Sequence, residues 1–221
     1  MTTKRVPLVE GEIYHVFNRT VAKEKIFNEK RYCTQALSLI NYYRFPQRMR
    51  FSKYKLLEPE LKKAYWQSII SNSELIDIYA FSLMPNHYHF VVYQKNNKGI
   101  NTFIGNFQNS FAKYFNILTF RTGSVFQDRF KAKRITSEPE LKHVIRYIHL
   151  NPVTAGLIKL EQLETTAITS HIAYIQKYKI PFIKKDILKQ YFSSIDSYKK
   201  FIADNEDYQK KLHKIKKLLF D

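Results

Sequence analysis

The chain has 221 residues, and its 37 Lys and Arg against 19 Asp and Glu give a formal net charge of +18 at pH 7. Hydrophobic residues make up 44% of the sequence, enough for a folded core, and the positive charge favours a polyanion such as nucleic acid as the partner. The single cysteine, Cys33, excludes a disulfide framework, a thiolate zinc site and an Fe–S cluster.

Further function classes are excluded by what the sequence lacks. No stretch is apolar for long enough to span a membrane, and no apolar signal core follows the first residues, so we expect a cytoplasmic protein. With 5 glycines in all, the chain has neither a P-loop nor a dinucleotide fingerprint, which argues against ATP-driven or NAD-dependent chemistry.

The first third of the chain alternates a strand with helices. Residues 12–17 are β-branched and aromatic and follow Gly11, which predicts a strand. Residues 31–43 have apolar positions at helical spacing. Residues 44–63 are basic and aromatic and are interpreted as a loop that leads into a helix near residues 61–70.

The middle of the chain predicts a β-hairpin and two further helices. Residues 76–83 and 87–93 are strand-like on either side of Met84-Pro85-Asn86, which suits a tight antiparallel connection. Residues 100–116 carry Phe and Tyr at helical spacing, and an extended piece over 123–130 ends in a basic run over 129–134. A second helix is expected over 137–150, opened by a capping box of Ser137 and Glu140 and stopped by Pro152.

This order of elements predicts an α+β fold, an antiparallel sheet with helices packed on one face. We expect one domain over residues 1–160, with a basic aromatic insertion near residues 45–75. Residues 161–221 form a Lys-rich, mostly helical extension that ends in a basic run over 210–217.

His87-Tyr88-His89 is the sharpest chemical feature. Residues i and i+2 of a strand point to the same face, so both imidazoles project together. Two such imidazoles form half of a divalent metal site, although either histidine alone is more often a core or surface residue.

A second feature lies in the predicted helix over 137–150. Tyr147 and Asn151 are four residues apart and share a helix face, so the Asn151 amide oxygen is placed to complete a metal shell beside the Tyr147 hydroxyl. His149 lies on another side of this helix, whereas His143, one turn before Tyr147, shares its face and is a candidate neighbour. In isolation, both Tyr147 and Asn151 are more often packing and helix-end residues.

Several spaced blocks together resemble the IS200-like single-tyrosine (Y1) HUH transposases, and within them the branch associated with repetitive extragenic palindromes. The blocks run in the family's order through most of the chain, and residues 169–174 resemble the family's carboxyl extension. They are residues 14–19 (YHVFNR), 82–89 (SLMPNHYH), 123–131 (GSVFQDRFK) and 147–153 (YIHLNPV).

The resemblance implies a ferredoxin-like HUH fold and a transposase that cleaves and rejoins hairpin-bearing single-stranded DNA through a 5′-phosphotyrosine. It implies that His87, His89 and Asn151 bind Mg²⁺ or Mn²⁺ and that Tyr147 is the nucleophile. Tyr114 is the rival nucleophile, ranked lower because no amide side chain lies one helical turn away. The enzyme is expected to be a monomer or a homodimer.

Basic residues are expected to bind the DNA backbone, and interleaved aromatic residues to stack on unpaired bases. The stacking candidates are Phe45, Phe51, Tyr54, Phe126 and Phe130, of which Phe126 and Phe130 favour a core position. The basic candidates are Arg19, Arg44, Arg48, Arg50, Arg129, Lys131, Lys133 and Arg134.

Two other functions remain open from the sequence. One is a catalytically silent regulator that binds DNA hairpins. The other is a metal-dependent phosphodiesterase in which water attacks the phosphorus and Tyr147 only packs.

Overall fold

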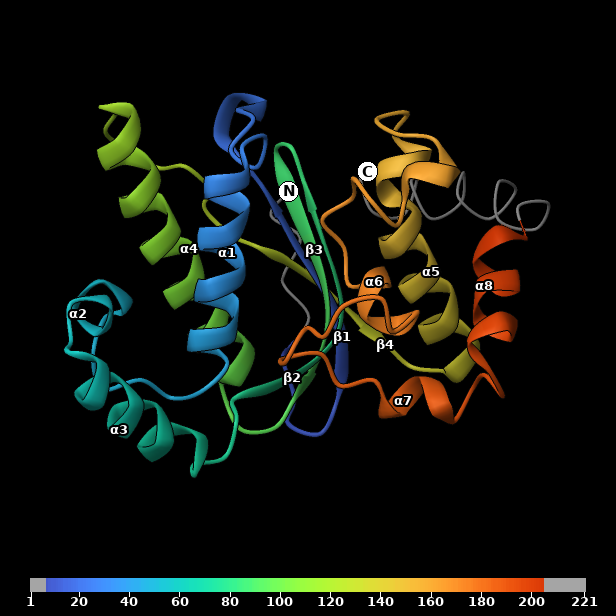
Figure 1. The fold of residues 1–221 in the computed structure, drawn as a ribbon, viewed down its shortest axis with the longest axis horizontal. Helices are drawn as coiled ribbons and strands as arrows, with labels where there is room; N and C mark the ends of the chain where they lie inside the picture. The colour runs from blue at the N-terminus through green and yellow to red at the C-terminus, as the bar shows by residue number, and fades with distance from the viewer. Residues whose placement is uncertain (1–6, 205–221) are drawn as a thin grey trace.

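A computed structural model describes residues 7–204, whose centre is a four-stranded antiparallel sheet in the order β2-β3-β1-β4 (Figure 1). The order of these strands along the chain, with one helical connection before β2 and another before β4, is that of a ferredoxin-like βαββαβ unit. The hairpin predicted at Pro85-Asn86 joins β2 to β3. The strands are β1 (Ile13–Arg19), β2 (Ile76–Met84), β3 (His87–Gln94) and β4 (Lys131–Ile135).

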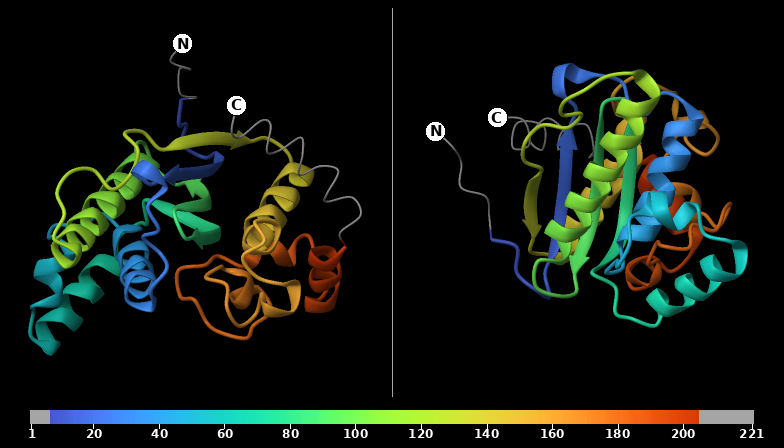
Figure 2. Two further views of the ribbon diagram at one scale, coloured as in Figure 1. Left: turned by 90° about the horizontal axis from the view of Figure 1, so that it is seen from above. Right: turned by 90° about the vertical axis from the view of Figure 1, so that its left-hand side faces the viewer.

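Helices cover both faces of the sheet (Figure 2). On one face α1 (Lys30–Tyr43) packs beside α4 (Gly99–Thr119), whose Phe103 and Phe107 rings contact Phe90 and Tyr88 of β3. On the other face lies α5 (Glu138–Thr154), against β2 and β3. The predicted α+β class is confirmed. The helices are not confined to one face of the sheet as predicted, because α5 packs on the face opposite α1 and α4.

Helix α5 does not stop at Pro152. The proline lies inside the helix, and the last turn closes through bonds from the Ala155 N–H to the Asn151 carbonyl and from the Leu157 N–H to the Pro152 carbonyl. A proline removes one intrahelical donor, and here burial of Leu150, Asn151 and Pro152 holds the turn in place. At the other end Ser137 caps the Glu140 N–H, whereas the Glu140 carboxylate reaches the Thr136 N–H, so the predicted capping box is half formed.

The insertion forms two short helices at the end of the sheet where β2 begins, the lower left of Figure 1. They are α2 (Phe51–Lys55) and α3 (Pro59–Ile70). Their aromatic side chains gather around Tyr42 of α1, with Tyr65 and Trp66 contacting its ring. The insertion therefore extends the core of the α1 side.

The carboxyl extension is less helical than expected in its described part. It contains short helices joined by irregular segments, and it pairs with the free edge of β2 through bridges from Thr169 to Ser82 and from Ile183 to Ile78. Such pairing covers an edge that would otherwise present unpaired backbone groups. The short helices of the extension, with η2 at its start, are η2 (Leu160–Gln162), α6 (His171–Tyr174), α7 (Asp186–Lys189) and α8 (Ile195–Ala203). Near the start of the chain, one further short helix, η1 (Val21–Lys23), follows β1.

None of the helices described over residues 7–204 has the length and apolarity to cross a bilayer. The predicted basic run over 210–217 lies outside the described residues.

Candidate active site

The register of β1 against β3 assembles one face of the sheet from five side chains. His89 pairs with Phe17, and His87 pairs with Arg19. Paired residues project to the same side, and so do residues two positions apart along a strand. Phe17, Arg19 and His15 therefore share a face with the two histidines, whose rings are 5.1 Å apart between centroids.

Helix α5 brings Tyr147 against this face. The Tyr147 ring lies edge-on to His89, with 5.6 Å between centroids, and 6.1 Å from His15. The Asn151 side chain interacts with the Tyr147 phenol. The structure thus brings together the four residues His87, His89, Tyr147 and Asn151, all within one chain.

Burial sets the protonation of the site. It raises the pKa of Tyr147 to about 12, although the Asn151 side chain and the positive charge of Arg19 both favour the phenolate. Burial, and then Arg19, lower the pKa of His87 to about 4, and burial holds the pKa of His89 well below its usual range. At neutral pH both imidazoles are uncharged, the form that binds metals.

The donor atoms fit a divalent cation. The Nε2 atom of His89 is buried and has no hydrogen-bond partner in the structure, while Nδ1 of His87 lies 2.7 Å from Asn86 Oδ1, which leaves its Nε2 available. Over residues 7–204 no three His, Cys, Asp or Glu side chains form a metal cluster. A cation held here therefore needs the Asn151 amide oxygen, with water or substrate oxygens to complete its shell, as Mg²⁺ and Mn²⁺ accept.

His15 is a site residue that sequence reasoning did not single out. Its Nε2 lies 2.9 Å from His89 Nδ1, and its side chain is almost completely buried. The signal was available in the strand alternation of residues 15, 17 and 19, but using it requires the pairing of β1 with β3, which no local pattern specifies.

The rival nucleophile Tyr114 lies on the opposite side of the sheet. It belongs to α4, and its ring contacts Tyr32 of α1. The sheet therefore separates Tyr114 from His87 and His89.

Three of the predicted basic residues lie on the face of the candidate site. Arg19 pairs with His87, and on the other side of β1 Lys131 pairs with Phe17 and Lys133 with His15. Lys133 also bonds to Glu140, with 3.2 Å between nitrogen and oxygen. Arg129 is exposed in the loop that enters β4. A basic strip thus follows β4 beside the histidines.

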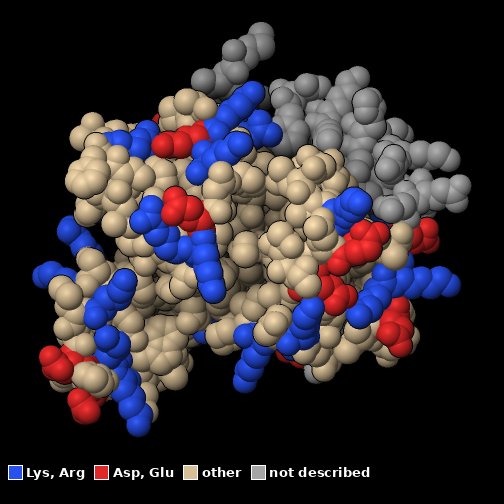
Figure 3. Space-filling view, turned by 45° about the horizontal axis from the view of Figure 1, so that its top comes forward, with Lys and Arg blue, Asp and Glu red and all other residues tan. Residues whose placement is uncertain are grey.

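The other predicted basic residues lie elsewhere. Arg44 is buried in an ion pair with Glu74, which withdraws it from phosphate. Arg134 points to the other face of the sheet and is bound to Glu12. Arg48 and Arg50 are exposed within the insertion, directly before α2, which lies away from the end of the sheet that carries His87. On the face drawn in Figure 3, Lys and Arg side chains are spread out rather than gathered in one patch.

The predicted stacking aromatics are mostly core. Phe45, Phe51, Phe126 and Phe130 are buried, and Tyr54 is partly buried within the aromatic cluster of the insertion. Phe120, which was not among the predicted stacking residues, is 98% exposed where α4 ends and has a left-handed backbone with φ of 52°. An ion pair between Arg121 and Glu24 joins this tip to the segment that leaves β1, at the His87 end of the sheet.

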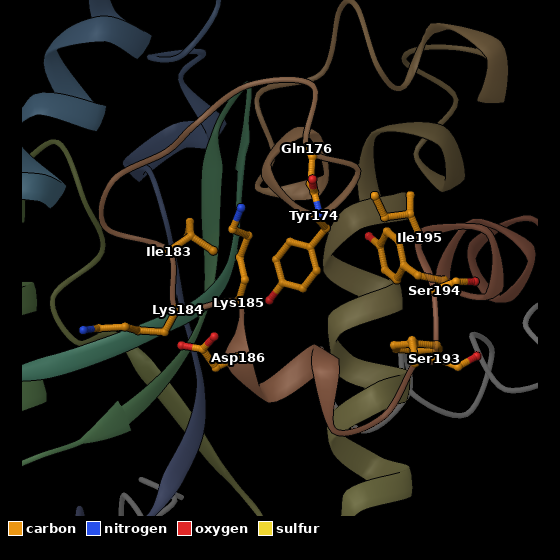
Figure 4. A pocket seen from close by; sticks show the side chains of 11 residues that line it. Tyr174, Gln176, Ile183, Lys184, Lys185, Asp186, Ser193, Ser194 and Ile195 are labelled. Carbon is orange, nitrogen blue, oxygen red and sulfur yellow. The ribbon is translucent and has the colours of Figure 1, made fainter.

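A cavity of about 520 Å³ lies away from this site, within the carboxyl extension. Tyr174 and Lys185 project toward its interior, and Ser193 and Ser194 border it before α8 (Figure 4). None of the histidines on β1 and β3 lines it, so this cavity and the candidate chemistry are separate.

The comparisons with known proteins agree with this arrangement. The model of the IS200-like transposase family matches residues 47–151, which confirms the resemblance seen in the sequence. A solved REP-associated tyrosine transposase bound to a REP hairpin matches with a TM-score of 0.55, covering 83% of this chain and 92% of that chain. At 14% identity that likeness establishes the fold alone. No curated protein matches the chain.

Proposed function

Because residues 47–151 belong to the IS200-like transposase family, we propose that the chain is a transposase that cuts and rejoins hairpin-bearing single-stranded DNA through Tyr147. The observation that carries this proposal is the position of the Tyr147 ring, edge-on to His89 and beside Asn151. A nucleophile next to a site for a phosphate-binding cation is the arrangement that phosphoryl transfer needs.

His87, His89 and Asn151 are the residues that would hold Mg²⁺ or Mn²⁺. Such a cation, when bound, neutralises charge on the non-bridging oxygens of the scissile phosphate. The orphaned Nε2 of His89 supports this assignment, because a buried polar atom without a partner is costly unless a ligand satisfies it.

Tyr147 performs the covalent step. Its phenol loses a proton, its oxygen forms a bond to phosphorus, and the bond from phosphorus to the 3′ oxygen breaks. The products are a 5′-phosphotyrosine and a free 3′-hydroxyl. The positive charge of Arg19 favours the phenolate. Since the phosphodiester becomes another ester, a second 3′-hydroxyl can reverse the step without ATP.

DNA binding is assigned to the His87 end of the molecule. Arg129, in the loop before β4, and Lys131 of β4 supply phosphate contacts, and Lys133, which also bonds to Glu140, lies beside them. Phe120 offers an exposed ring for an unpaired base. The hairpin held by the solved REP-associated transposase supports hairpin DNA as the ligand.

The test is incubation of the protein with labelled single-stranded hairpin DNA and Mg²⁺ or Mn²⁺, followed by denaturing electrophoresis. We expect a covalent adduct that Tyr147→Phe and His87→Ala abolish and that Tyr114→Phe, the matched control on the other side of the sheet, retains. An adduct retained in Tyr147→Phe and lost in Tyr114→Phe would overturn the choice of nucleophile.

The same assay separates the two alternative functions. Cleavage without an adduct indicates attack by water. Hairpin binding without cleavage indicates a catalytically silent regulator. The position of Tyr147 against His89 and Asn151 favours the active enzyme over this alternative.

A further inference from the structure

The two histidines of the candidate metal site, His87 and His89, are each held by a contact to the Nδ1 atom of the ring. His87 uses Nδ1 to contact Asn86 Oδ1 at 2.7 Å, and His89 uses Nδ1 to contact His15 Nε2 at 2.9 Å. In both rings the Nε2 atom is the one not used in these bonds. This is the pattern in which a neighbour orients a metal-binding imidazole.

The Asn86 contact defines the tautomer of His87. An amide oxygen only accepts, so the His87 Nδ1 atom carries the proton and its Nε2 has a free lone pair. The Asn86 amide nitrogen is directed toward the Lys23 carbonyl, which agrees with this orientation.

The His15 contact leaves two arrangements open for His89. The His15 Nε2 and His89 Nδ1 atoms lie 2.9 Å apart, and both side chains are almost completely buried. At this distance one of the two ring nitrogens must donate a hydrogen bond while the other accepts it. If His15 donates, the His89 proton is on Nε2 and blocks a cation; if His89 donates from Nδ1, Nε2 is free.

We propose that His15 is a positioning residue that accepts a hydrogen bond from His89 Nδ1 and thereby presents the Nε2 lone pair of His89 to the cation. The burial of His89 Nε2 without a partner fits this arrangement, since an N–H there would be a buried donor left unsatisfied. Phe17, which stacks on His89 with 5.5 Å between centroids, restrains the ring from a second side. The inference rests on the metal site of the proposed function.

Mn²⁺ titration of the DNA-free protein by calorimetry tests the inference without activity as the readout. We expect His15→Phe, which keeps a ring but cannot accept, to weaken Mn²⁺ binding by about 10- to 100-fold. His15→Gln, whose amide oxygen can accept, should restore affinity to within a few fold. Thermal unfolding of each variant reports on folding.

The tautomer itself provides a second, metal-free measurement. Carbon and nitrogen NMR shifts of labelled imidazoles should show His89 protonated on Nδ1 in the wild type and shifted toward Nε2–H in His15→Phe. His89 protonated on Nε2 in the wild type would overturn the inference.

The outcomes also separate this inference from the function on which it rests. Equal Mn²⁺ affinity in wild type and His15→Phe, with loss in His87→Ala, would overturn the role of His15 and leave the metal site intact. Absence of any His87-dependent Mn²⁺ binding in the wild type would instead overturn the metal site, and the inference with it.

Discussion

The phenol of Tyr147 is in the wrong protonation state for attack when the protein is at rest. Its pKa of about 12 means that only a small fraction is ionised at neutral pH, and that fraction grows tenfold with each pH unit below the pKa. In the proposed reaction, burial of Tyr147 therefore restrains attack until substrate and cation are in place.

We expect the single-turnover rate of adduct formation to rise with pH from about 6 to about 9, because the raised pKa lies above this window. Burial lowers the pKa of His87 to about 4 and holds the pKa of His89 well below its usual range, so both histidines stay neutral throughout this window and should not affect the pH dependence of the rate. Quenched time courses at saturating Mn²⁺ measure the rate. A rate that falls across the window would contradict a phenol nucleophile.

At the scale of single residues, the sequence predicts part of the candidate site. His87, His89, Tyr147 and Asn151 are found from the strand period and from spacing on a helix, since both are local rules. His15 and the burial of Arg44 depend on which distant segments meet. The same is true of Phe120, whose exposure reflects the absence of packing at the end of α4.

At the scale of elements, the carboxyl extension fixes the helix that carries the nucleophile. His149, two residues after Tyr147, contacts Ser170 Oγ at 2.7 Å through Nε2 and the Tyr198 hydroxyl at 2.8 Å through Nδ1. The same hydroxyl lies 2.8 Å from Nδ1 of His171. These side chains are buried, so the network ties α5 to α6 and α8.

Tyr198→Phe removes the hydroxyl shared by the two imidazoles. We expect the free energy of unfolding to fall by about 1–3 kcal/mol, the cost of leaving buried polar atoms without a partner. Urea denaturation measures it. Tyr178→Phe, at an exposed tyrosine of the same extension, should change stability by no more than about 0.5 kcal/mol, and equal effects in the two variants would refute the network.

The tip of α4 is expected to contribute to DNA affinity. Phe120→Ala should weaken binding to hairpin DNA with single-stranded flanks by about 5- to 150-fold, corresponding to about 1–3 kcal/mol for one stacked base. Fluorescence anisotropy measures the affinity, with Tyr178→Ala as an exposed aromatic control. Equal affinities for the two variants would remove Phe120 from the interface.

The elements themselves were largely predictable, and the misses have physical causes. The predicted long helices and the first three predicted strands lie close to their observed ranges because hydrophobic period is a local property. The extended piece predicted over 123–130 is instead an irregular segment, and the fourth strand begins at Lys131. The continuation of α5 through Pro152 and the use of the basic run as strand β4 are set by tertiary contacts instead. Pairing with β1 makes residues 131–135 a strand, and lysines on such an edge also discourage pairing with other chains.

At the scale of the whole molecule, the net charge does not map onto one binding patch. Arg44 and Arg134 are neutralised by ion pairs, and Arg48 and Arg50 lie far from the histidines. We therefore expect the charge of +18 to supply general attraction to a polyanion, and the residues of and before β4 to determine where DNA lies.

If DNA lies beside β4 rather than over the whole charged surface, substituting two exposed arginines should change the salt dependence of DNA affinity differently. Arg129→Gln should lower hairpin affinity and make the dependence of log affinity on log salt shallower by about 0.7–0.9, the value for one lost phosphate contact. Arg48→Gln, at the far end, should leave that slope unchanged. Binding titrations over a range of salt concentrations measure both. A shallower slope in Arg48→Gln alone would place the DNA at the insertion.

The central claim, that Tyr147 becomes covalently joined to DNA, is tested most directly by mapping the adduct. Trypsin cuts after Arg146 and after Lys113, so Tyr147 and Tyr114 begin different peptides, residues 147–159 and 114–121. After reaction with hairpin DNA and Mn²⁺, followed by nuclease and trypsin digestion, mass spectrometry should find a 5′-linked nucleotide on Tyr147 in the first peptide. A nucleotide on Tyr114, or cleaved DNA with both peptides unmodified, would contradict the account.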